Sequence, residues 1–113
     1  MEDADIPTRP VSDWQPITNK ADLAHLGKLG EEICECGASI FRCIIQGIDE
    51  SEPETGKLNK EWLEDELADV IALAEFAINR FRLDRQRIGL RAAKKTAYKA
   101  PWFERLAMQS GER

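Results

Sequence analysis

The sequence lacks the features that would indicate a membrane, secreted or β-sheet protein. No apolar run among its 113 residues approaches the roughly 20 that a membrane-spanning helix needs. The opening residues, MEDADIPTRP, are acidic and polar and contain no apolar segment of a secretory signal. No segment alternates apolar and polar residues as a half-buried strand does. We therefore expect a cytoplasmic, all-α protein without a membrane segment.

Cysteine and histidine are scarce, and their placement favours ordinary structural roles. The three cysteines, Cys34, Cys36 and Cys43, all lie in one expected helix. An odd count without a secretory signal indicates reduced thiols and not a disulfide framework. Cys34 and Cys36 point to different sides of the helix and would chelate a metal poorly, so we interpret the cysteines as packing residues. His25, the only histidine, is interpreted as a satisfied polar residue.

Charge is abundant and unevenly distributed along the chain. Residues 1–79 carry 18 acidic and 6 basic side chains, whereas residues 80–113 carry 3 acidic and 10 basic ones. The composition, 42% hydrophobic and 33% charged, is ordinary for one globular domain. The basic residues 80–113 could bind phosphates, or they could contact the acidic part of the same fold or of a partner subunit.

Helical periodicity and helix-breaking residues predict one helical domain with two flanking segments. We expect an extended arm over residues 1–18, a helical domain over 19–100 and a short tail over 101–113. Within the domain, apolar spacing predicts helices over about 20–46, 59–82 and 84–99. Pro101 is expected to end the third helix. Segment 47–59, rich in glycine, proline and charge, is predicted to be a loop, and Asn59 is predicted to cap the second helix.

Two acidic pairs share a face with apolar residues on their expected helices. In EEICE, Glu32 and Glu35 lie on a stripe that borders the apolar face of the first helix. In the second helix, Glu66 and Asp69 fall among apolar residues, apart from a solvent-facing acidic set of Glu61, Glu64, Asp65 and Glu75. A carboxylate partly removed from water needs a partner or a proton.

If the two helices pack antiparallel across the loop, the four carboxylates of these pairs converge. Four such oxygen donors suit a hard cation, Mg²⁺, for which Mn²⁺ is expected to substitute. Because Mg²⁺ usually binds together with substrate phosphates, the pattern indicates an enzyme acting on a nucleotide or another phosphate ester. The alternative is a set of solvated acidic faces without a ligand.

The motifs around these residues resemble a known family. ExxE in Glu32-Ile-Cys-Glu35, followed on the next helix by ExxD in Glu66-Leu-Ala-Asp69, is similar to the pattern of the MazG-like all-α nucleoside triphosphate pyrophosphohydrolases. The surrounding KLGEEICE and NKEWLEDELADVIAL agree with it. Lys95-Thr-Ala-Tyr98 resembles a KxxYN segment of small, often phage-encoded members, although Lys99 replaces the asparagine. The spacing between Glu35 and Glu66 is slightly longer than is usual in the family. The resemblance covers about residues 22–100.

This resemblance implies the reaction (d)NTP + H₂O → (d)NMP + PPi. Glu32, Glu35, Glu66 and Asp69 would hold Mg²⁺ against the triphosphate, and Glu31 would orient or deprotonate the attacking water. The resemblance favours a purine deoxynucleotide such as dGTP, and implies action in the host cytoplasm if the chain is phage-encoded. It also implies a helical bundle completed by oligomerisation, as a homodimer or homotetramer, which agrees with the wide apolar faces of the expected helices.

Five residues are candidates for contacting the nucleotide. Lys95 and Tyr98 lie one turn apart in the basic segment and could bind phosphates, in the same or a neighbouring subunit. The other three are Lys28, Arg80 and Trp62, the last as a wall of the site. The alternative is a surface ion pair for each basic residue and core packing for Trp62.

A competing interpretation is a non-enzymatic helical module that binds a partner or nucleic acid. Segment 80–99 carries eight basic residues and one acidic residue, Asp84. Aromatic rings are few there, Tyr98 among them, and the whole chain is acidic with a net charge of -5, so nucleic acid is the less favoured partner.

Overall fold

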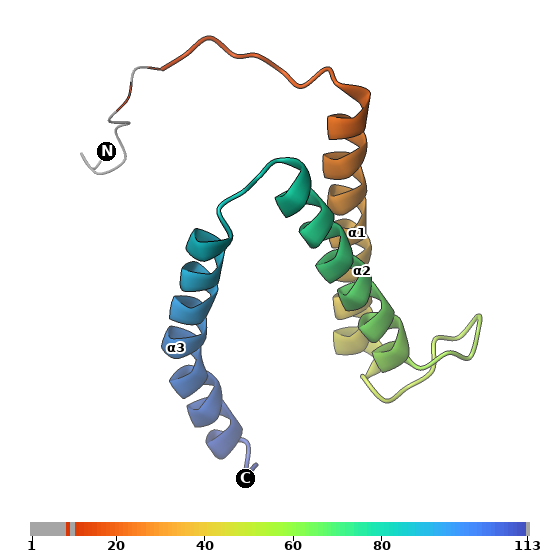
Figure 1. Ribbon diagram of the computed structural model, residues 1–113. Coiled ribbons are helices and arrows are strands. Elements are labelled where there is room, and N and C mark those ends of the chain that lie inside the picture. Colours follow the sequence, from red (N-terminus) through yellow and green to blue (C-terminus); the bar gives the residue numbers. More distant parts are fainter. Residues whose placement is uncertain (1–8, 10, 113) are drawn as a thin grey trace.

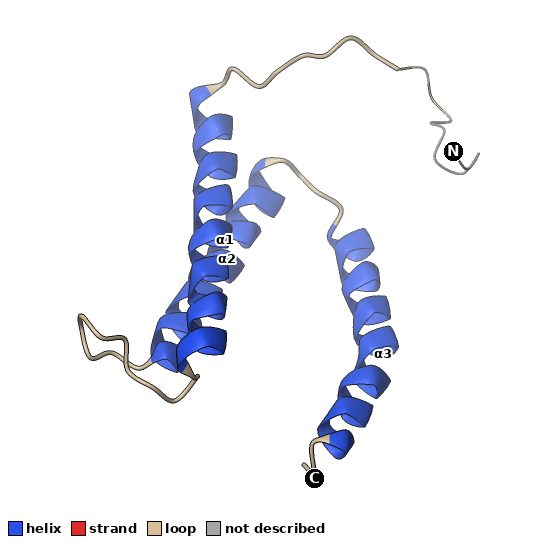
Figure 2. Ribbon diagram, turned by 180° about the vertical axis from the view of Figure 1, so that it is seen from behind, coloured by secondary structure: helices blue, strands red, loops and turns tan. Residues whose placement is uncertain are grey.

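Three helices and their connections make up the fold, seen in Figure 1, a computed structural model that describes residues 9 and 11–112. α1 (Lys20–Gln46) and α2 (Asn59–Arg80) form an antiparallel hairpin, and α3 (Arg85–Gln109) follows. Among the described residues there is no strand, only an isolated bridge between Ser51 and Leu58 (Figure 2). The expected all-α class is confirmed.

The expected N-terminal arm is described only in part. Residues 1–8 and 10 lie outside the described residues, and residues 11–19 have no regular secondary structure. The arm ends at Asn19, whose side-chain oxygen accepts a hydrogen bond from the Asp22 N–H at 3.0 Å. This contact satisfies one of the amide groups that are left free at a helix start, and so α1 begins at Lys20.

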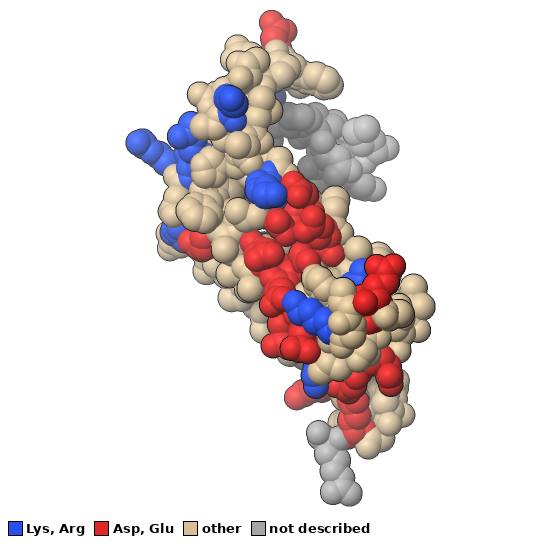
Figure 3. Space-filling view, turned by 90° about the vertical axis from the view of Figure 1, so that its right-hand side faces the viewer, with Lys and Arg blue, Asp and Glu red and all other residues tan. Residues whose placement is uncertain are grey.

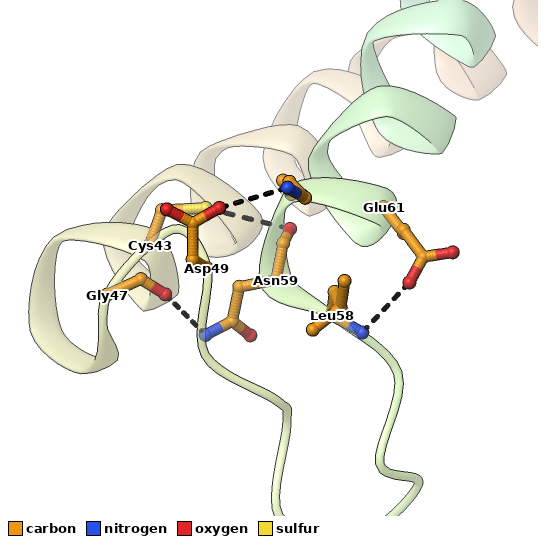
Figure 4. A network of polar contacts seen from close by, with 7 residues as sticks. Cys43, Gly47, Asp49, Leu58, Asn59 and Glu61 are labelled. Atoms are coloured by element: carbon orange, nitrogen blue, oxygen red, sulfur yellow. Dashed lines mark hydrogen bonds and ion pairs between the residues drawn. The ribbon is translucent and has the colours of Figure 1, made fainter.

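The junction between α1 and α2 is built around one buried amide. Asn59 was expected to cap α2, but that expectation is wrong: Leu58 occupies the cap position, and Asn59 is the first helical residue. The Asn59 side chain is fully buried and donates to the Gly47 carbonyl at 2.9 Å (Figure 4). It also donates to Gln46 Oε1 at 3.2 Å. Gly47 ends α1 with a positive φ of 105°. The amide therefore joins the end of one helix to the start of the next.

Replacing Asn59 with alanine is expected to destabilise the hairpin. The change removes both hydrogen bonds and leaves the Gly47 carbonyl without this donor, which typically costs about 1–3 kcal/mol of unfolding free energy. Gln46→Ala is the matched control, because it removes only one of the two bonds. Urea denaturation followed by circular dichroism measures both variants. Equal losses in the two variants would contradict a central role for the Asn59 amide.

The third helix is longer than expected. It was predicted to end near residue 99 because of Pro101, but it continues through that proline to Gln109. Proline removes the hydrogen bond from its own nitrogen to the carbonyl four residues earlier. Pro101 and Ala97 are both exposed, so water can satisfy the Ala97 carbonyl and the helix is not forced to stop. Residues 101–109 are therefore helix and not an irregular tail.

The hairpin packs closely, while α3 contacts it little. Arg80 donates a hydrogen bond to Asp22 at one end of the hairpin, and the Cys43 thiol donates to the Asn59 carbonyl at the other. These two contacts define the antiparallel register. Only α1 and α2 pack extensively against each other, and the two opposite views in Figures 1 and 2 both show α3 standing apart. The start of α3 is tied to α2 by Arg85, which reaches Glu75 at 2.8 Å.

Few residues are buried within this single chain. Among the described residues, the buried set is small and mostly polar: Glu32, Ser39, Asn59, Cys36 and Ala77. Large apolar side chains remain exposed on all three helices, Ile44 of α1, Ile71 of α2 and Phe103 of α3 among them. None of the described helices combines the length and apolar character that crossing a membrane requires.

Candidate metal centre

The hairpin register brings together the carboxylates that the sequence singled out. One oxygen each of Glu32, Glu66 and Asp69 lies within 4.8 Å of the other two, and the same holds for Glu31, Glu32 and Glu35. Glu32 belongs to both groups and links them. The arrangement follows from i,i+3 spacing on each helix and from the antiparallel pairing of α1 with α2.

Glu32 is the buried centre of this carboxylate cluster. Its side chain is only 9% exposed, and its Oε2 has no hydrogen-bond partner among the described residues. Glu66 is half-buried, and its Oε2 also has no hydrogen-bond partner among the described residues. Glu35 and Asp69 are exposed. Burial raises the pKa of Glu32, and the neighbouring charges of Glu35, Asp69 and Glu66 raise it further. A buried carboxylate without a partner is costly, so this position favours a cation or a proton.

Basic side chains do not neutralise the centre of the cluster. Lys28 bonds to Glu31 at 3.2 Å, with both side chains exposed, and this contact raises the pKa of Lys28. No salt bridge involves Glu32, Glu35, Glu66 or Asp69 among the described residues. Figure 3 shows acidic side chains gathered in a stripe along the hairpin, with few basic ones between them. The donor set, carboxylate oxygens only, fits a hard divalent cation.

Arg80 lies far from the cluster. It was a candidate for contacting the nucleotide, but its Nε donates to Asp22 at 2.8 Å and its Nη2 to Asn19 at 3.4 Å. It is eleven residues beyond Asp69 on α2, about 16 Å along the helix axis. Arg80 therefore ties the end of α2 to the start of α1, and the structure does not bring it to the carboxylates.

Lys95 and Tyr98 lie on α3, which the chain does not fold against the cluster. Both are exposed, and together with Arg91 and Lys94 they line a shallow hollow of about 180 Å³. Since α3 stands apart from the hairpin, the fold does not bring these residues to the carboxylates of the same chain.

Trp62, the candidate wall residue, lies beside the cluster. It is half-buried and lines a pocket of about 360 Å³ that also includes Glu35 and Glu66. Two further residues of this pocket, Ser39 and Arg42, were not among the sequence candidates. They follow Glu35 by four and seven residues and therefore share its helix face, which is the signal that could have identified them.

Comparison of the chain with protein-family models, with curated proteins and with solved structures finds no match in any of the three.

Proposed function

We propose that the chain is a metal-dependent nucleoside triphosphate pyrophosphohydrolase, which converts a (d)NTP and water into a (d)NMP and pyrophosphate. The observation that carries this proposal is Glu32, a buried carboxylate that lies among four further carboxylates and that no basic side chain pairs with. A structural role alone would favour a neutral or ion-paired side chain there, because an unpaired buried charge destabilises the fold. The ExxE and ExxD motifs supply Glu32, Glu35, Glu66 and Asp69 of this cluster.

Each residue of the cluster has a role in the proposed reaction. Glu32, Glu35, Glu66 and Asp69 would hold Mg²⁺, which when bound neutralises phosphate charge and lowers the pKa of a coordinated water. Glu31 is exposed beside Glu32 and Glu35, so its carboxylate can accept the proton of the attacking water. The water oxygen forms a bond to the α-phosphorus. The bond between the α-phosphorus and the oxygen that bridges it to the β-phosphorus breaks, and pyrophosphate leaves.

A homodimer or homotetramer would complete both the fold and the site. α1, α2 and their loop, residues 20–80, carry fourteen acidic and six basic side chains, whereas α3 carries seven basic and one acidic. The two parts are complementary in charge and both expose large apolar side chains. Packing α3 of one copy on the hairpin of another would cover these faces in a helical bundle and bring Lys95 and Tyr98 toward the phosphates.

Metal affinity is expected to fall as the pH is lowered toward the raised pKa of Glu32. A proton then competes with the cation at a less acidic pH than for an ordinary glutamate. In the metal-free protein the native state holds this proton more tightly than the unfolded chain does. The free energy of unfolding therefore falls as the pH rises from the ordinary glutamate pKa through the native pKa of Glu32. Below the ordinary glutamate pKa, Glu32 is protonated in both states and no longer destabilises the fold.

Thermal melting between about pH 5 and pH 8, with Mn²⁺ or with EDTA, measures this linkage. The stabilisation by Mn²⁺ should be largest at the upper end of the range and shrink toward the lower end. A stabilisation that is independent of pH would contradict metal binding at Glu32.

The proposed reaction is tested by incubating the protein with each of the common NTPs and dNTPs, with Mg²⁺, Mn²⁺ or EDTA. Chromatography of the products should show a monophosphate and pyrophosphate that require the metal. Release of orthophosphate would instead indicate cleavage of the terminal phosphate on the same carboxylate site. No turnover of any nucleotide would reject the pyrophosphohydrolase.

The exposed, basic α3 supports a second candidate, binding of nucleic acid. Arg87, Arg91, Lys94 and Lys95 form a basic surface on α3 that no acidic side chain neutralises by a salt bridge within the described chain. Such binding would weaken steeply with added salt and would not require a metal. Electrophoretic mobility shift at low and high salt, in EDTA, distinguishes it from the hydrolase.

A further inference from the structure

The described part of the N-terminal arm presents an apolar edge to solvent. Trp14 is 91% exposed, the largest fraction among the large apolar side chains of the described residues, and Ile17 is 42% exposed. Pro16 favours the extended polyproline conformation, which has three residues per turn, so Trp14 and Ile17 are expected on one side of the arm. Tryptophan combines a large apolar area with a polar N–H and is enriched at interfaces, so this edge is suited to binding another surface.

Trp14 differs from the other two tryptophans of the chain in its lack of a cationic partner. The Lys57 ammonium lies 4.1 Å from the centroid of the Trp62 ring, and the Lys99 ammonium lies 5.1 Å from that of Trp102. No lysine or arginine lies over Trp14 among the described residues. A basic surface with apolar side chains between its charges would suit both this ring and the carboxylate of the adjacent Asp13.

The first half of α3 offers a surface of this kind. Its members recur at helical spacing on one face of α3 and line a hollow of about 540 Å³, large enough for an indole ring: Arg87, Ile88, Arg91, Ala92 and Lys95. Ile88 and Ala92 are the apolar members, and both are exposed in the single chain. The three basic side chains are also exposed, and none forms a salt bridge with a described residue.

The arm and this face of α3 match in charge and in length. Residues 1–18 carry four acidic and one basic side chain, whereas α3 carries seven basic and one acidic. In the polyproline conformation residues 13–17 span about 12 Å, and residues 87–95 span about 12 Å along the axis of α3. The acidic, apolar segment 13–17 can therefore cover the hollow from one end to the other.

The arm and α3 leave the hairpin at the same end. Arg80, the last residue of α2, donates to Asp22 at 2.8 Å and to Asn19 at 3.4 Å, and α3 begins five residues later. In Figures 1 and 2 the arm nevertheless runs clear of α3. A single chain thus leaves both surfaces uncovered, and a second copy supplies the missing half of each contact.

We propose that two copies of the chain exchange their arms, so that residues 13–17 of each copy bind the first half of α3 of the other. Trp14 packs on Ile88 and Ala92, and Asp13 pairs with Arg91. The contact is reciprocal, as a two-fold interface requires. This inference rests on the homo-oligomer proposed above but not on the proposed reaction. It leaves the second half of α3, with its exposed Phe103, for packing on a hairpin.

Reversing the charges of one ion pair tests the exchange. Sedimentation velocity over a dilution series at low salt compares the dissociation constants of the wild type, Asp13→Arg, Arg91→Asp and the double variant. Each single variant should weaken the assembly roughly 5- to 30-fold, since two modest ion pairs are lost in each dimer. The double variant should regain most of this loss, because opposite charges face each other again.

The control and the failure of this test are equally defined. Glu54→Arg makes the same change of charge at an exposed position of the loop and should leave the dissociation constant unchanged. A loss in both single variants without recovery in the double variant would show that Asp13 and Arg91 do not pair and would overturn the inference. A wild type that remains monomeric would overturn it as well.

Crosslinking shows which copy the arm binds. Carbodiimide joins a carboxylate to a nearby lysine, and isotope-labelled and unlabelled chains are refolded together before the reaction. Mass spectrometry should find Asp13 of one label joined to Lys94 or Lys95 of the other, and fewer such products in Trp14→Ala. Products within one label only would show that the arm binds its own α3 and would overturn the exchange.

Two further outcomes separate this inference from the proposed functions. An α3 that binds an oligonucleotide but gives no crosslink to Asp13 would assign this face to nucleic acid and would overturn the exchange. Absence of nucleotide hydrolysis together with mixed-label crosslinks would reject the pyrophosphohydrolase and support the exchange.

Discussion

Replacing Glu32 with glutamine is expected to abolish metal-dependent turnover while raising the melting temperature of the metal-free protein. Glutamine keeps the size of the side chain but removes the buried charge and its repulsion by Glu35, Asp69 and Glu66. The fold should therefore become more stable when no metal is present. Loss of the central carboxylate should lower turnover more than about 100-fold, since even the partners of metal ligands commonly contribute 10–100-fold.

The two opposite effects are measured on one variant. Melting temperature in EDTA and in Mn²⁺ gives the stability of each form, and pyrophosphate release gives the activity. Glu64→Gln is the matched control, because Glu64 belongs to the solvent-facing acidic set of α2 and is exposed. If Glu32→Gln retains the stabilisation by Mn²⁺, or if Glu64→Gln loses activity equally, the carboxylate cluster is not the metal site.

Replacing Ile44 with glutamate is expected to dissociate the proposed homodimer or homotetramer into monomers. Phe41, Ile44 and Ile45 lie within one turn of α1 and are 63%, 71% and 80% exposed in the single chain. Covering a side chain such as Ile44 stabilises an assembly by about 1–2 kcal/mol, and a buried glutamate in its place would oppose assembly by more. Because Ile44 is largely exposed in the single chain, the hairpin itself should remain helical.

Sedimentation velocity and circular dichroism together test this expectation. The wild type should sediment as a dimer or tetramer, and Ile44→Glu as a helical monomer with a lower melting temperature. Val11→Glu, at an 83% exposed position of the arm, introduces the same charge away from the helices and should leave the oligomer intact. A wild type that is monomeric at micromolar concentration would contradict an obligate assembly.

The helices and the acidic pairs were predictable because they depend on local sequence. Glu32 with Glu35, and Glu66 with Asp69, share a face through the 3.6-residue period alone. The start of α1 was also local, because the Asn19 side chain binds an amide only three residues away. At Pro101 a local rule failed: an exposed helix loses one hydrogen bond at a proline but can regain it from water.

The tertiary structure decided which of these residues are buried and which are paired. The sequence treated Glu32, Glu35, Glu66 and Asp69 alike, but packing of α1 on α2 buries Glu32 and leaves Glu35 and Asp69 in solvent. The same register pairs Arg80 with Asp22, far from the cluster. Burial and partner choice depend on which turns of two helices face each other, and the periodicity of one helix does not contain that information. For this reason the residue types of the candidate site could be predicted from the sequence, and their burial and pairing only from the fold.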